Sequence, residues 1–233
     1  TESIAFLLVK VSQLICDIPQ IFELKINPLL ADQHGISVGA AHMRVAKVCD
    51  PTTSRLAILP YPKELEQEIR LADGQTLLLR PIRPEDEPAY MKLFESLPPE
   101  DILMRFLSPM KTLSHSLAAR LTQIDYDREM ALALFGKDRS GETELLGGVR
   151  FCADADNDRA EFAILLRRDM TGMGLGPMML RRIIEAARQR GIRELYGEIL
   201  DENEPMLKLC KAFGFTLKRI PEDPGVLTAC LAL

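Results

Sequence analysis

The sequence has no excess of positive charge. Its 29 Lys and Arg residues are outnumbered by 34 Asp and Glu residues, which gives a formal net charge of −5. Phosphate backbones are bound by concentrated Lys and Arg side chains, so this balance excludes a protein whose main partner is nucleic acid. We therefore expect a small-molecule or protein substrate and no nucleic acid.

Cysteine and histidine are scarce and scattered. The cysteines form no CxxC pair and the histidines have no HxxxH spacing, which excludes the common zinc and redox motifs. These residues are Cys16, Cys49, Cys152, Cys210 and Cys230, and His34, His42 and His115. We expect no metal site, reduced thiols and a cytoplasmic protein.

Long hydrophobic runs are also absent. The apolar stretch at residues 4–9 ends at Lys10, far short of the roughly 20 residues that span a bilayer. It also lacks the basic leader of a signal peptide. We expect no interaction with a membrane.

The hydrophobic share of 47% is enough for one good-sized domain with a smaller piece beside it. At the amino terminus, an apolar stripe at helical spacing follows Ser3 and ends before Pro19. Two β-like runs follow at residues 21–30 and 36–45. A helix and two strands cannot form an independent core, so residues 1–48 are predicted to be the end of a larger domain.

A linker is predicted at residues 49–64, where proline, threonine and serine occur without periodicity. The main domain is then residues 65–233. Its strands are predicted at residues 66–71, 75–82, 130–135, 144–152, 159–166, 194–200, 215–218 and 226–231, and its helices from Pro84 and over 99–106, 114–123, 177–190 and 204–213. We expect an α/β domain with a mixed, mostly antiparallel sheet flanked by helices.

A glycine-rich loop lies between a predicted strand and a predicted helix at residues 171–176. Main-chain N–H groups at such a helix start bind phosphate oxygens, and glycine lets a pyrophosphate approach closely. A Rossmann dinucleotide site would place this loop after the first strand of the domain. A P-loop would need Gly-Lys-Ser/Thr, which is absent. The loop comes late in the domain and lacks the P-loop residues, so neither alternative fits.

The loop resembles the pyrophosphate loop of GNAT acetyltransferases, Gln/Arg-x-x-Gly-x-Gly/Ala, with Thr171 in the first place. Residues 79–86 resemble the usual opening of such domains. Asn203 followed by Phe213-Gly214-Phe215 resembles their ending. The resemblance covers nearly all of residues 65–233 and implies the GNAT fold with acetyl-CoA as acyl donor.

The resemblance also implies the residues of the cofactor site. Main-chain groups of Ile164, Leu165, Leu166 and Arg167 are expected to pair with the pantetheine arm, and the phosphates are expected at Thr171, Gly172, Met173, Gly174, Leu175, Gly176 and Pro177. Thr171 is expected to contribute mainly its main-chain N–H. Asn203 is expected to bind the CoA arm, to cap the following helix, or to do both.

Glu161 is the predicted general base, because the resemblance assigns that role to a carboxylate in this strand. The alternative for Glu161 is a solvated strand residue or an ion-pair partner. Cys210 stands where many family members have a tyrosine that protonates the leaving thiolate. We interpret Cys210 as core, since it lies between Leu207 and Phe213 at helical spacing. The polar loop at residues 125–128 is either a substrate contact or a solvated loop.

The amino-terminal piece carries a second resemblance. Ser12-Gln13-Leu14 and residues 23–30 resemble the closing segment of ATP-grasp domains in ADP-forming acyl-CoA synthetases. That family usually has an acidic residue where Lys25 stands, and a lysine cannot hold Mg²⁺. Residues 1–48 are therefore interpreted as a structural remnant, with synthetase-like domains expected upstream.

The order of the two segments is similar to that in bacterial protein lysine acetyltransferases. The sequences at residues 122–130 and 160–163 also resemble this subfamily. We expect acetyl transfer from acetyl-CoA to a lysine ε-amine of a protein substrate, with an acyl-CoA synthetase as the expected partner. The alternatives are a small-amine N-acetyltransferase and a non-catalytic acetyl-CoA sensor.

Overall fold

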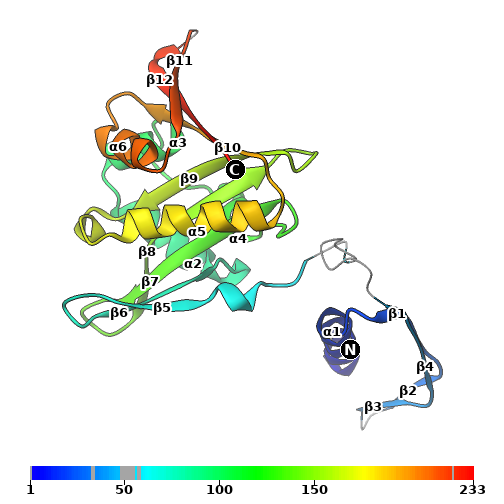
Figure 1. Ribbon diagram of the computed structural model, residues 1–233. Helices are drawn as coiled ribbons and strands as arrows, with labels where there is room; N and C mark the ends of the chain where they lie inside the picture. Colours follow the sequence, from blue (N-terminus) through cyan, green and yellow to red (C-terminus); the bar gives the residue numbers. More distant parts are fainter. Residues whose placement is uncertain (1, 33–34, 48–55, 57–58, 222) are drawn as a thin grey trace. The chain divides into compact units, whose positions relative to one another are not determined.

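The computed structural model describes residues 2–32, 35–47, 56, 59–221 and 223–233 (Figure 1). The chain divides into two compact units, Thr1–Pro60 and Tyr61–Leu233. The predicted linker spans this division, and most of its residues lie outside the described part of the chain. Within the described residues, no helix has the length and apolarity that a membrane span requires.

The first unit contains helix α1 (Glu2–Asp17) and two separate strand pairs. Strand β1 (Ile21–Ile26) pairs with β4 (Ala41–Val45), and β2 (Leu29–Asp32) pairs with β3 (Gly35–Val38), both antiparallel. The predicted β runs at residues 21–30 and 36–45 are therefore each divided into two strands, so the prediction of one strand per run is wrong. The breaks occur at Pro28, which has no N–H for a ladder, and at Gly39, whose N–H donates to the Pro28 carbonyl.

The first unit has little hydrophobic core. Among its described residues, Ile21 is the buried apolar side chain, whereas Phe6, Leu8 and Phe22 are each more than 60% exposed. This exposure agrees with the expectation that a helix and short strands cannot bury a core by themselves.

The second unit is built on an eight-stranded sheet with the order β11-β12-β10-β9-β8-β7-β6-β5. The strands are β5 (Gln67–Arg70), β6 (Thr76–Pro81), β7 (Glu129–Lys137), β8 (Thr143–Ala153), β9 (Arg159–Leu166), β10 (Glu194–Leu200), β11 (Thr216–Ile220) and β12 (Asp223–Ala232). The β9–β10 pair is parallel, and the other neighbouring pairs of this sheet are antiparallel. The predicted mixed, mostly antiparallel sheet is confirmed.

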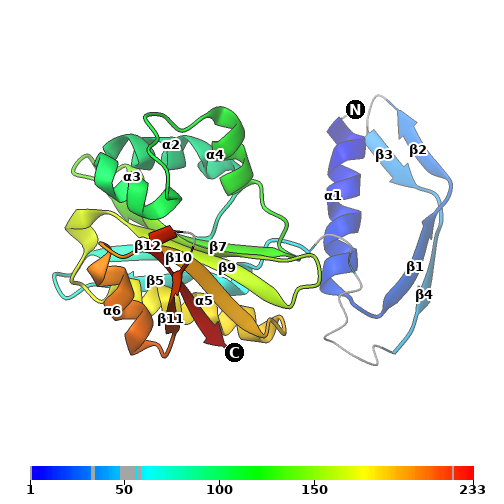
Figure 2. The same ribbon diagram turned by 90° about the horizontal axis from the view of Figure 1, so that it is seen from above.

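Helices cover both faces of this sheet. Figure 2 shows α2 (Glu87–Ser96), α3 (Pro99–Phe106) and α4 (His115–Thr122) on one face and α5 (Leu175–Gln189) on the other. Helix α6 (Glu204–Ala212) lies beside β11. Short 3₁₀ turns are η1 (Lys63–Leu65), η2 (Pro84–Asp86) and η3 (Arg168–Met170). Each face has its own hydrophobic cluster of buried side chains.

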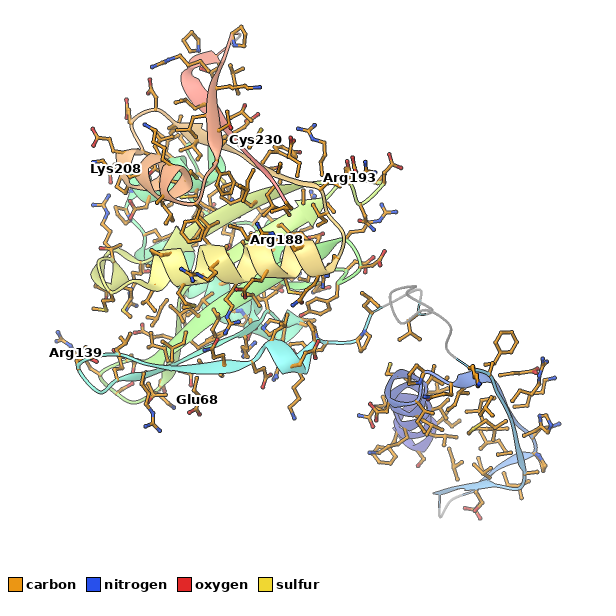
Figure 3. The ribbon with its side chains drawn as sticks, viewed as in Figure 1. Glu68, Arg139, Arg188, Arg193, Lys208 and Cys230 are labelled. Carbon is orange, nitrogen blue, oxygen red and sulfur yellow. The ribbon has the colours of Figure 1, made fainter. Side chains whose placement is uncertain are left out.

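Helix α5 shows how the sequence pattern fixes the packing. Its buried side chains recur at helical spacing and include Met179, Leu180, Ile183, Ile184 and Ala187. Burying each large aliphatic side chain of this kind contributes about 1.5–3 kcal/mol. Arg181, Arg182 and Arg188 are exposed, and Figure 3 labels Arg188 on this helix. These arginines form a mainly solvated face of the helix.

Candidate active site

The two parallel strands at the centre of the sheet separate part of the way along. The β9–β10 register runs over three residue pairs, of which Glu161–Tyr196 is the last, although β9 continues to Leu166 and β10 to Leu200. Beyond Glu161 the edge of β9 on the β10 side is therefore left without a paired strand in the described sheet. A gap of this kind accepts an extended ligand as an added strand.

The register on the other side of β9 decides which main-chain groups face the gap. In an antiparallel pair, residues alternate between bonding their neighbour and pointing away from it. The N–H of Arg167 donates to the Leu146 carbonyl (2.9 Å), and Leu165 opposes Gly148 in the same phase. The N–H and C=O groups of Ile164 and Leu166 therefore point toward the gap.

This geometry bears on the predicted cofactor contacts. The main chains of Leu165 and Arg167 are turned toward β8, so we expect the main chains of Ile164 and Leu166 to pair with pantetheine. The Arg167 side chain is also engaged, since its guanidinium binds Glu144 (2.7 Å) and Asp169 (2.7 Å). Those two hydrogen-bonded carboxylates raise the pKa of Arg167, so its charge is permanent and internally balanced.

The glycine loop leads directly into α5. Gly172 and Gly174 have positive φ angles of 77° and 76°, a conformation that glycine adopts without strain. A Cβ atom at either position would meet no protein atom within 4 Å. Gly174 is the N-cap of α5, and the first turn of this helix contains no acidic side chain. Its N–H groups are thus available to a phosphate in open space.

Thr171 does not supply the N–H expected of it. Its main-chain N–H and its hydroxyl both donate to the carbonyl of Arg168, at 3.1 Å and 2.6 Å. The 3₁₀ turn η3 consumes these donors, and the sequence pattern did not indicate that turn. Leu175 is buried and Met173 is 47% exposed, so their predicted contacts can involve main-chain groups of the loop.

A groove of about 650 Å³ joins the strand gap to the glycine loop. Its walls come from β9, β10, α3, α6 and the loop. The predicted site residues among its lining are Glu161, Ile164, Leu165, Leu166, Thr171, Gly172, Gly174, Gly176, Pro177 and Asn203. The structure therefore brings residues of β9, the glycine loop, the start of α5 and the N-cap of α6 together in one groove. Arg167, Met173 and Leu175 are not among its lining residues.

Three carboxylates line this groove. Asp101 is bound by Arg168 through Nη2 (2.9 Å) and Nε (2.9 Å), which ties α3 to η3. Glu161 and Glu198 are exposed and lack an ion pair or side-chain hydrogen bond within residues 59–221 and 223–233. Both can therefore accept a proton. Sequence reasoning missed Glu198, although its place in the strand pattern of β10 puts it on the same face as Glu161.

Asn203 has a confirmed structural role. Its side-chain oxygen accepts a hydrogen bond from the N–H of Met206 (3.2 Å), so it caps α6. Asn203 also lines the groove, and its side-chain amide nitrogen can still donate a hydrogen bond to a ligand there. The predicted contact with the CoA arm stays a prediction.

Cys210 lies in the core. It is fully buried within the α5-side cluster, and burial raises the pKa of its thiol to about 12. It is absent from the groove lining. The position that carries a tyrosine in many relatives therefore has no proton donor that reaches a thiolate in the groove.

The loop at residues 125–128 folds on itself instead of entering the groove. The Asp125 carboxylate accepts from the N–H of Asp127 (3.0 Å), and the Tyr126 hydroxyl donates to the carbonyl of Ile82. Its residues do not line the groove, which favours the structural interpretation. Among the described residues there is no group of three or more His, Cys, Asp or Glu side chains that could hold a metal ion.

Comparison with known proteins assigns this arrangement to a family. The model of the acetyltransferase (GNAT) domain matches residues 76–216. The chain belongs to the GNAT acetyltransferases. It is 35% identical over 164 residues to an acetyltransferase of Pseudomonas aeruginosa, an alignment that covers 70% of this chain and 87% of that protein. The model of an ATP-grasp domain matches residues 1–45, as the second resemblance implied.

Solved structures agree with the GNAT assignment. The GNAT domain of Streptomyces lividans PAT is 31% identical, with a TM-score of 0.65, and the match covers 75% of this chain and all of that one. The protein yncA of Salmonella typhimurium, solved with its cofactor acetyl-CoA, shares the fold at 17% identity and a TM-score of 0.53; the match covers 67% of this chain and 94% of that one. GNAT relatives thus bind acetyl-CoA, and the groove described above fits that cofactor.

Proposed function

We propose that this GNAT domain transfers the acetyl group of acetyl-CoA to the ε-amine of a lysine in a protein, with Glu161 as general base. The observation that carries the proposal is the groove. It offers a free strand edge, a phosphate-binding helix start at one end and an unpaired carboxylate at the other. We place the protein in the cytoplasm, where acetyl-CoA and reduced thiols coexist.

The cofactor would lie along β9. Its pyrophosphate would accept hydrogen bonds from the N–H groups at the start of α5, with Gly172 and Gly174 leaving room for it. Its pantetheine amides would pair with the main-chain groups of Ile164 and Leu166. This pairing depends on no side chain of β9, so the geometry of the strand alone would position the thioester.

The transfer step requires an uncharged amine. A lysine ammonium has a reference pKa of about 10.4, so at neutral pH a proton must leave before attack. Glu161 would accept that proton, directly or through one water molecule. The amine nitrogen then bonds to the acetyl carbon, and the carbon–sulfur bond breaks. The CoA sulfur leaves as thiolate, and the nitrogen releases its remaining extra proton to solvent or to that thiolate, which leaves a neutral amide. Main-chain N–H groups of the β9 edge would stabilise the negative charge on the carbonyl oxygen.

Two comparisons support a protein acceptor. The GNAT domain is 31% identical to that of PAT, and an ATP-grasp match at residues 1–45 precedes it in the same chain. This order of segments resembles that of the bacterial protein lysine acetyltransferases, and an acyl-CoA synthetase is the substrate that we propose.

The decisive experiment supplies the chain with acetyl-CoA and a panel of acyl-CoA synthetases, and maps acetyl-lysines by mass spectrometry. We expect acetylation of one or a few lysines in a native synthetase and much less in the same protein after unfolding. Equal turnover of free small amines would support the small-amine alternative. Acetyl-CoA binding without any product would support a sensor.

A further inference from the structure

Arg105, near the end of α3, is a charged side chain without a partner. In residues 59–221 and 223–233, no carboxylate lies within ion-pair distance of its guanidinium and no hydrogen bond reaches it. The guanidinium stacks on the ring of Phe106, with its central carbon 4.8 Å from the ring centroid. This contact shields the charge from water without neutralising it.

Arg105 is half-buried in mainly apolar surroundings that hold a second cation. A small apolar pocket is lined by Arg105, Tyr90 and Arg150, and it shares Arg105 and Leu165 with the main groove. Burial lowers the pKa of Arg105, and Arg150 lowers it further, while Glu161 acts in the opposite direction. Arg150 is already paired with Glu129. Arg105 therefore remains the free cation of this pocket.

A half-buried, unpaired guanidinium favours an anion that can reach it, because charge-assisted hydrogen bonds then replace the water it has lost. Under the proposed function the phosphates of the cofactor are not that anion. The pyrophosphate is expected at the glycine loop and the 3′-phosphate lies farther still from the thioester, whereas Arg105 interacts electrostatically with Glu161, the expected base. The acetyl group carries no charge. The acceptor substrate is the remaining molecule that must enter beside Glu161.

We propose that Arg105 binds a carboxylate carried by the acceptor next to its reactive amine. Glu161 and Glu198 attract the ammonium group, and Arg105 binds the carboxylate beside it, so the groove matches a pair of opposite charges. This inference rests on the proposed function. Under that function, the carboxylate is the side chain of an aspartate or glutamate close to the target lysine. In a free amino acid, the α-carboxylate would supply the same chemistry.

The test compares matched acceptors. Blocked peptides with one lysine carry either Asp or Asn at the neighbouring positions, and a free amino acid is compared with its carboxamide. We expect the wild type to favour the Asp peptide by about tenfold or more in kcat/KM, mainly through KM, as hydrogen bonds to charged groups allow. In Arg105→Gln this ratio should fall toward one. Arg139→Gln, an exposed arginine in the β7–β8 turn, should keep it (Figure 3).

A binding measurement separates this inference from the proposed function. The same peptides with norleucine in place of lysine cannot be acetylated, and calorimetry with the CoA-bound protein measures their affinity. Preferential binding of the acidic peptide, lost in Arg105→Gln and partly kept in Arg105→Lys, supports the inference even if no protein is acetylated. A preference confined to the free amino acid would support the carboxylate site and overturn the protein acceptor.

Three results would overturn the inference. The first is an equal response of wild type to Asp and Asn acceptors, or no binding of any acidic acceptor. The second is an equal loss of kcat for every acceptor in Arg105→Gln, which would mean that Arg105 acts through Glu161. The third is a changed choice between acetyl-CoA and succinyl-CoA with acceptor preference intact, which would assign Arg105 to the acyl group.

Discussion

The ring of Phe162 lies so close to Gly197 that the two strands carrying them can only approach here through glycine. A Cβ atom at position 197 would come within 2.8 Å of the Phe162 ring and 3.0 Å of its carbonyl oxygen. This contact stands immediately after the last β9–β10 pair. Phe162 and Gly197 therefore mark the point at which the sheet opens into the groove.

Gly197→Ala should disturb both stability and cofactor binding. The added methyl group meets main-chain as well as side-chain atoms, so the strands must shift, at a cost of about 1–3 kcal/mol in the free energy of unfolding. The shift changes the gap, and the affinity for acetyl-CoA should fall. Urea denaturation and calorimetry measure the two effects. Gly225→Ala in β12 is the control, because its Cβ would make an ordinary 3.6 Å contact. Equal behaviour of the two variants would contradict this account of the opening.

Glu161→Gln should slow acetyl transfer by about a hundredfold or more at neutral pH, because the amide cannot accept a proton. Acetyl-CoA affinity should change little, since the proposed cofactor contacts are main-chain groups. The deficit should shrink at high pH, where more of the amine is already deprotonated.

Glu198→Gln is the matched control for this base, because it removes the second unpaired carboxylate of the same groove. We expect it to slow turnover much less than Glu161→Gln. Rates are measured against pH for both variants with one acceptor. If Glu198→Gln shows the larger loss and Glu161→Gln turns over like the wild type, the base is Glu198.

Gly174→Asp should abolish acetyl-CoA binding. The carboxylate would stand at the N-cap of α5, where the pyrophosphate is expected, and like charges repel there. Gly174→Asn is the control, since Asn has nearly the same size and also tolerates the left-handed conformation of this position. Calorimetry should show a much smaller loss for Asn. Retained affinity in a folded Asp variant would remove the loop from the cofactor site.

Removal of residues 1–60 should leave a folded, active transferase. The second unit contains both large hydrophobic clusters, and its sheet uses no strand of the first unit. Tyr61 must be kept, because its hydroxyl donates to the Glu66 carboxylate at 2.7 Å. We expect unchanged kcat/KM in a fixed peptide assay, with thermal denaturation as the control for folding. A large fall in turnover with the domain still folded would give the first unit a direct role.

Cys210→Ala should leave kcat unchanged. The thiol is buried away from the groove, and burial raises its pKa to about 12, so it stays protonated throughout the neutral range. In the folded protein it should resist alkylation at pH 8 and react only after unfolding. The substitution should cost about 1 kcal/mol of stability. A large fall in kcat without unfolding would make Cys210 the proton donor.

Much of the fold was predictable because the strongest sequence patterns are local. The structure places α3 at Pro99–Phe106, β9 at Arg159–Leu166 and β10 at Glu194–Leu200, the same bounds as those predicted. The glycine loop was found by its place between a strand and a helix. In each case an apolar pattern of helix or strand period marks the element.

The acceptor side of the site was only partly predictable. Glu161 was expected from the resemblance, but Arg105 and Glu198 belong to other elements of the chain, and only the fold brings the three side chains to one groove. The direction of each main-chain N–H on β9 depends on its register with β8, and no local pattern specifies register. The 3₁₀ turn η3, which accepts the hydrogen bonds of Thr171, is likewise too short to produce a periodic pattern in the sequence.

The open edge of β9 has a consequence for the protein without its cofactor. Unpaired strand edges are templates on which other chains add strands and aggregate. Here the edge lies inside the sheet, with α3 and α6 contributing to the walls of the groove in front of it. These walls favour a slender ligand over a foreign polypeptide strand. Cofactor bound along this edge would cover its free main-chain groups as well, and so add to the protection of the sheet from self-association.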